Sequence, residues 1–268
     1  MKKVIILLLL IIGSVSCKND TEEINFKVGF LPNSIYTQVQ NQIVENTINY
    51  VASKDIIESL KKNGVSNPDT SKSNIVLKSI VRTGSTFRNS FPIHIEFLES
   101  NHSVLKKDSK FYGKSEGGVT KIDSIISDKM TTDTKEMVRA TMETMLNQIK
   151  YPERKIKIGE SFENRTPMKM PVYLPIKIEV ESIYTLEKIE NGIGYFNLYH
   201  RIRSKTKDYR KSLVGRGKGT MKYDIEKNFF TKLYSEMEIN VQAELEGFGV
   251  KLSIKSIADQ NTEILKKE

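Results

Sequence analysis

Few residues in this sequence have side chains suited to covalent or metal chemistry. Cys17 is the only cysteine in the 268-residue chain, and the only histidines are His94, His102 and His200. The histidines are too far apart to form the H-x-H or H-x-x-x-H spacings by which one strand or helix presents two metal ligands. We therefore expect no metal site and no cofactor, with each histidine an ordinary core or surface residue.

The remaining candidates for catalysis are also weak. The sequence contains no G-x-S-x-G motif, which would place a nucleophilic serine on a sharp turn. Carboxylates such as Glu179, Glu181, Glu236 and Glu238 alternate with apolar residues, and we interpret them as the solvated face of strands. A catalytic carboxylate pair cannot be chosen without its geometry. The sequence therefore favours a protein that is not an enzyme.

A glycine-rich run, Gly215-Arg216-Gly217-Lys218-Gly219, invites comparison with phosphate-binding loops. Those loops lead from a strand into a helix, whereas this run leads into the strand expected over residues 220–225. Glycines at every second position share one face of a strand, where they permit a close approach or a sharp bend of the sheet. We expect this structural role.

The surroundings of Cys17 indicate attachment rather than reactivity. Lys2 and Lys3 precede nine apolar residues, 4–12, and then small residues lead to the cysteine. This is the order of an export signal, and nine residues are too few to span a bilayer, which takes about 20. Ser14-Val15-Ser16-Cys17 resembles the lipobox of bacterial lipoproteins, although Ser14 stands where that family prefers leucine. The resemblance implies that residues 1–16 are a signal peptide and that Cys17 carries the lipid.

The rest of the chain has the pattern of a β-rich domain. Residues 17–30 are expected to be the lipidated cysteine and its tether, and residues 31–268 a single globular domain. Period-2 alternation, typical of strands with one buried face, is clearest over residues 231–246. Short connectors such as Glu190-Asn191-Gly192 suit hairpins, so the C-terminal half is predicted to be an antiparallel meander of about five strands.

The N-terminal half is predicted to hold strands over residues 34–49, 74–87, 92–99 and 118–126, with a short helix over 55–62. Apolar residues at helical spacing predict one main amphipathic helix over residues 132–150. The predicted fold class is therefore α+β: a large, curved antiparallel sheet, shaped like a half-barrel, that wraps around this helix.

Methionines provide the one hint of a ligand site, because thioethers adapt to irregular apolar ligands. Packing in an ordinary core is the alternative explanation for them. The candidate ligand-binding residues, which would line a cavity between sheet and helix, are Met137, Val138, Met142, Met145, Met168 and Met170.

A further resemblance supports a cavity. The lipobox, the curved meander, the inner helix and the segments Tyr151-Pro152, Ile158-Gly159-Glu160-Ser161-Phe162 and Gly217-Lys218-Gly219 resemble exported lipoproteins of unknown function. Phe162 replaces the tryptophan that is usual there. Those proteins are similar in architecture to lipoprotein carriers with a half-barrel sheet, which implies a lipid-binding cavity by analogy of fold.

Three functions follow as hypotheses for an outer-membrane lipoprotein on its periplasmic or surface side. The first is binding of an apolar or lipid-like ligand between sheet and helix. The second is a structural or interaction role, in which the polar sheet face or an exposed edge docks other envelope components. The third is carboxylate-dependent hydrolysis of envelope polymers. The 42 basic and 33 acidic residues are scattered, so no nucleic-acid partner is expected.

Overall fold

The computed structural model describes residues 22–102, 105–128, 130–148, 151–169, 177–205, 211–245 and 247–266. The predicted signal peptide, Cys17 and Met170 lie outside these ranges. Within them, no helix is both long enough and apolar enough to cross a membrane.

Strands dominate the chain. The two helices of the described residues are α2 (Lys54–Lys62) and α3 (Thr132–Gln148). The strands are β1 (Glu23–Phe26), β2 (Ser34–Ala52), β3 (Asp69–Thr83), β4 (Ser90–Ser100), β5 (Lys110–Glu116), β6 (Val119–Ile126), β7 (Arg154–Lys157), β8 (Ser161–Lys169), β9 (Lys177–Glu190), β10 (Ile193–Ser204), β11 (Lys211–Asp224), β12 (Phe229–Leu245) and β13 (Phe248–Lys266).

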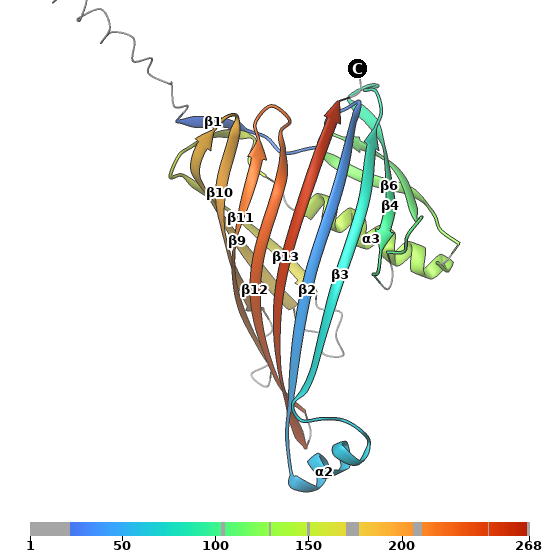
Figure 1. The fold of residues 1–268 in the computed structure, drawn as a ribbon, viewed down its shortest axis with the longest axis vertical. Helices are drawn as coiled ribbons and strands as arrows, with labels where there is room; N and C mark the ends of the chain where they lie inside the picture. The colour runs from blue at the N-terminus through green and yellow to red at the C-terminus, as the bar shows by residue number, and fades with distance from the viewer. Residues whose placement is uncertain are drawn as a thin grey trace, which may run out of the picture.

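Eleven strands form one antiparallel sheet in the order β6-β5-β4-β3-β2-β13-β12-β11-β10-β9-β8. Consecutive strands are hairpin neighbours except where β13 pairs with β2 along 19 residues of each strand. This pairing joins the N-terminal and C-terminal halves into a continuous sheet (Figure 1). The predicted five-strand meander is confirmed as β9 to β13.

The predicted α+β fold class is wrong, because strands make up 68% of the protein and helices only 10%. The protein is essentially all-β. The main helix was correctly placed in the sequence, but the sheet does not wrap around it. Instead α3 lies beside β4 and β6, at the edge of the sheet that β6 forms (Figure 1).

The inner face of the sheet, defined as the face that α3 covers, has three separate clusters of buried side chains. Val138 and Met142 of α3 pack in the first, against residues of β3 to β6 such as Ile95 and Phe111. In the second, a two-stranded sheet of β1 and β7 covers β8 to β12. The third cluster consists of one residue from each of β9 to β12, namely Ile178, Ile202, Leu213 and Val241. The separate clusters explain why one helix is not enough to cover this sheet.

Phe26 of β1 is the centre of the second cluster. Its ring lies 4.9–6.0 Å from those of five aromatic residues, Tyr151, Phe162, Phe196, Tyr223 and Phe230. Ile24 and Phe26 are both buried, although they come from the segment expected to be a tether. The described chain is therefore anchored in the core from residue 24 onward.

The structural role expected for the glycine run, a close approach between strands, is confirmed. Gly215, Gly217 and Gly219 lie on the inner face of β11, where an added Cβ would come 2.9, 2.7 and 2.2 Å from carbonyl oxygens of β12. Contacts under about 3 Å do not occur for real side chains. Glycine is thus required for β11 and β12 to approach each other so closely.

Side chains of α3 also protect an edge of the sheet. Asn147 accepts a hydrogen bond from the Thr120 N–H and donates one to the Thr120 carbonyl, both at 2.7 Å. Glu143 accepts one from the Ile122 N–H at 2.8 Å. Because β6 is an edge strand, these bonds satisfy backbone groups that would otherwise be free to pair with another strand.

Candidate binding surface on the outer face of the sheet

The six candidate ligand-binding residues do not form one group. Val138 and Met142 are only 2% and 9% exposed and pack in the core, whereas Met137 is 58% exposed. Met168 belongs to β8, at the opposite edge of the sheet from β6, which α3 contacts. The side chains of Met145 and Met168 are not described, and Met170 lies outside the described residues. Binding of an apolar ligand beneath α3 stays a prediction.

The histidines are dispersed as expected. His94 stacks on Tyr112 with ring centroids 4.5 Å apart, and His200 shares a 2.9 Å hydrogen bond with Ser182. Burial lowers the pKa of both histidines. Within the described ranges, no group of three or more His, Cys, Asp or Glu residues is placed to hold a metal ion.

The most organised polar feature is a row of charges on the outer face, opposite α3. Cross-strand partners in a sheet share a face, and the pairing register connects one charged residue from each of eight neighbouring strands. From β8 to β3 these are Arg165, Glu181, Arg201, Arg216, Glu238, Lys255, Glu45 and Lys72. At about 4.8 Å per strand the row spans roughly 34 Å.

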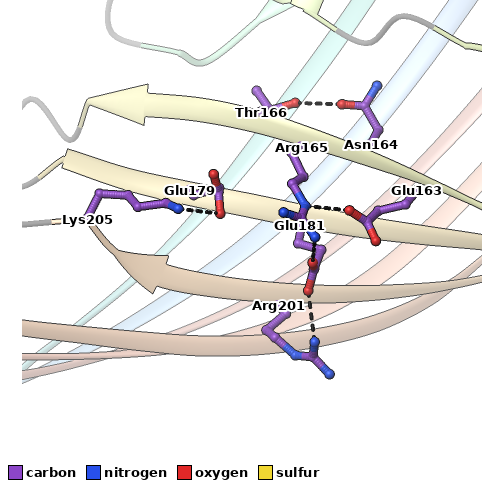
Figure 2. A network of polar contacts seen from close by, with 8 residues as sticks. All are labelled: Glu163, Asn164, Arg165, Thr166, Glu179, Glu181, Arg201 and Lys205. Atoms are coloured by element: carbon purple, nitrogen blue, oxygen red, sulfur yellow. Dashed lines mark hydrogen bonds and ion pairs between the residues drawn. The ribbon is translucent and has the colours of Figure 1, made fainter.

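Ion pairs hold both ends of this charge row. Glu181 lies between two arginines and bridges them, with Arg165 Nη2 at 3.0 Å and Arg201 Nη1 at 2.9 Å (Figure 2). Lys72 Nζ lies 2.7 Å from Glu45, and this partner lowers the pKa of the Glu45 carboxyl. Five of the eight charges are thus ordered by one another across strands.

The part of the row from β11 to β3 borders an open hollow of about 620 Å³. Charged residues Glu45, Lys72, Arg216, Glu238 and Lys255 of the row line it, as do other outer-face residues that include Ile43, Tyr199, Lys218, Glu236 and Ile257. Tyr199 and Ile257 are each 42% exposed. The outer-face hollow therefore combines exposed apolar surface with ordered charges, as binding sites do.

Carboxylate-dependent hydrolysis stays a prediction. A general acid needs a raised pKa to hold its proton at neutral pH. Among the described residues, the carboxyls with a displaced pKa are Glu23, Glu45 and Glu160, and hydrogen bonds with lysine, arginine or backbone partners lower each of them.

The polar face of the strands could be predicted from the sequence, but the row of charges could not. The charges of one strand can be read from alternation, whereas the register that aligns eight strands depends on where each hairpin turns. One available signal is the two-residue turn Asn191-Gly192, whose positive φ angles of 51° and 77° fix the β9–β10 register.

These features define an all-β protein with one large antiparallel sheet and an open, charged hollow on its outer face. No protein-family model and no curated protein matches the chain. Among solved structures, Ail, the attachment invasion locus protein of Yersinia pestis, is 6% identical over 86% of this chain and 99% of its own, with a TM-score of 0.15. Ail in complex with the heparin analogue sucrose octasulfate is 6% identical over 84% and 98%, with a TM-score of 0.14. Such low TM-scores carry no inference about this chain.

Proposed function

We propose that this protein is a lipid-anchored lipoprotein of the cell envelope that docks another envelope component in its outer-face hollow, without catalysis. The observation that carries the proposal is the hollow itself. Its exposed apolar side chains Tyr199 and Ile257 lie among charges that include the ion pairs Glu45–Lys72 and Glu236–Lys218. A solvated sheet face would need neither the hollow nor the apolar groups.

The lipid anchor is proposed from the sequence around Cys17. Its resemblance to exported lipoproteins supports the same location, with outer-membrane attachment the preferred case. The anchor would hold the hollow at high local concentration near its envelope partner. Apolar or lipid-like groups on that partner would contact Tyr199 and Ile257, and polar groups would contact the charge row.

The docking proposal is tested by crosslinking the full-length protein in intact cells and isolating it under denaturing conditions. Ile257→Asp is expected to reduce the yield of a defined crosslinked adduct at least tenfold, because it adds a charge to the apolar part of the hollow. Leu265→Asp is the matched control, because Leu265 lies on the same strand and face but outside the hollow. Equal adduct yields from the two variants would contradict docking in the hollow.

A further inference from the structure

Phe87, in the turn between β3 and β4, is the most exposed large apolar residue of the described chain, at 70%. The guanidinium of the next residue, Arg88, lies 5.2 Å from the centre of its ring. Single exposed apolar residues are common on protein surfaces. The meaning of this one therefore depends on what holds it there and on what lies nearby.

The turn that carries Phe87 is tight and does not suit its residues. Phe87 and Ser90 exchange two backbone hydrogen bonds, 2.7 and 3.0 Å long, around Arg88 and Asn89. Both central residues have positive φ angles, 48° and 65°, as type I′ turns require. Such turns favour asparagine and glycine, and arginine adopts a positive φ only under strain. The turn does not explain an arginine at position 88, which points to a use of its side chain.

The base of this hairpin is fixed to the segment that follows β1. The Asn33 N–H donates a hydrogen bond to the Gly84 carbonyl at 3.1 Å. The Ser85 hydroxyl donates one to the Asn33 side-chain oxygen at 3.0 Å. The Phe87–Arg88 tip, defined as these two residues, is thus presented from a rigid base.

The tip extends beyond the end of the sheet at which β1 lies (Figure 1). The pairing register places Leu265, Ile35 and Arg82 side by side across three strands at this end. Phe87 follows Arg82 by five residues, which takes it up to about 16 Å farther along the strand direction. A surface that touches the tip therefore leaves the outer face at Leu265 free.

A second exposed apolar residue lies where the chain enters the fold. Ile158 is 43% exposed, and its N–H donates a hydrogen bond to the Glu22 carbonyl at 2.9 Å. Glu22 follows Cys17 by five residues, which can span at most about 18 Å. A lipid on Cys17 would thus hold this end of the molecule, with Ile158 and the Phe87–Arg88 tip, against the bilayer.

We infer that the Phe87–Arg88 tip inserts into the surface of the bilayer that holds the lipid anchor. The inference rests on the proposed anchoring at Cys17 and adds a second contact with the same membrane. Apolar rings bind at the boundary between headgroups and acyl chains, and a neighbouring arginine keeps its charge among the lipid phosphates. Among the described residues, no carboxylate lies within 4.0 Å of the Arg88 guanidinium, so a phosphate has no competitor there.

The test uses the absence of tryptophan from the chain. Phe87→Trp adds one reporter to the lipidated full-length protein, which is reconstituted into phosphatidylcholine vesicles whose acyl chains carry bromine, a contact quencher of tryptophan. Its emission is expected to fall at least twofold relative to vesicles without bromine. Ile56→Trp is the control, because Ile56 of α2 is also exposed, at 37%, but lies at the opposite end of the molecule (Figure 1). Its emission is expected to be the same in both kinds of vesicle.

Flotation of the vesicles separates the two proposals. Protein that floats with them while Phe87→Trp emits equally with and without bromine would overturn the bilayer contact and leave the anchor standing. Protein that does not float would overturn both. Equal quenching of Ile56→Trp and Phe87→Trp would also contradict insertion by the tip. Docking in the outer-face hollow is tested separately by the crosslinked adduct of Ile257→Asp.

The part played by Arg88 has its own test. In the Phe87→Trp protein, Arg88→Asn is expected to weaken the quenching by bromine and to raise the thermal midpoint, because asparagine adopts a positive φ more readily than arginine. A merely structural role would not link weaker quenching to a more stable fold. Unchanged quenching in this variant would remove Arg88 from the contact.

Discussion

Single residues in β11 determine how closely β12 packs beside it and which charged side chains lie on the outer face. Glycines on its inner face allow β12 to approach, while Arg216 and Lys218 between them project to the outer face. The glycine pattern and its structural role could be predicted from the sequence because alternation assigns residues of one strand to two faces. The position of Arg201 opposite Arg216 could not, since it depends on the pairing register of β10 and β11.

At this scale, Gly219→Ala is expected to destabilise the fold by about 1–3 kcal/mol, the usual cost of overpacking. Its Cβ would come 2.2 Å from the Tyr234 carbonyl oxygen, which belongs to the backbone and cannot move alone. Chemical denaturation measures the change. Gly194→Ala is the matched control, because its Cβ would make ordinary 3.5 Å contacts with side chains. Equal destabilisation by both substitutions would contradict this explanation of the glycine run.

At the scale of elements, the strands with regular apolar alternation were predicted and those without it were missed. β5 places Phe111, Gly113 and Ser115 toward the inner face, so only one of its three inner residues is a large apolar one. β1 has only four residues. The helix α3 was found from its period, but its role at the sheet edge depends on Glu143 and Asn147, whose polar side chains do not add to an apolar pattern.

Removing these edge contacts with Glu143→Ala and Asn147→Ala is expected to promote self-association. The double variant exposes the backbone of β6 at Thr120 and Ile122, which can then pair with an edge of another copy. Light scattering after size-exclusion chromatography would detect dimers or larger species. Glu136→Ala is the control, since Glu136 pairs with Arg139 on the exposed side of α3. A double variant that remains as monomeric as the control would show that α3 does not protect the edge.

At the scale of the whole molecule, the sheet separates the two ends of the protein. β1 lies at one end and α2 at the other (Figure 1), and the 19 residues of β2 extend about 60 Å at 3.3 Å per residue. Six residues from Cys17 to Glu23 can span at most about 20 Å. A lipid on Cys17 would thus hold the β1 end near the membrane and leave α2 farther away.

Replacing the anchor residue tests this arrangement. Cys17→Ser is expected to move the protein from the membrane fraction to the soluble fraction without unfolding it, because the described core begins at Ile24, seven residues after Cys17. Fractionation and thermal melting would measure the two effects. A Cys17→Ser protein that stays with the membranes would contradict lipid anchoring.

The central claim, that the outer-face hollow is occupied in the cell envelope, is tested most directly by cysteine labelling. Cys17 is the only cysteine of the chain, so Ile257→Cys or Leu265→Cys adds one reporter thiol. The rate of maleimide labelling is compared between native membranes and the purified protein. We predict that labelling at position 257 is at least tenfold slower in native membranes while position 265, 65% exposed in the parent, reacts equally in both. Equal rates at position 257 in the two preparations would contradict the claim.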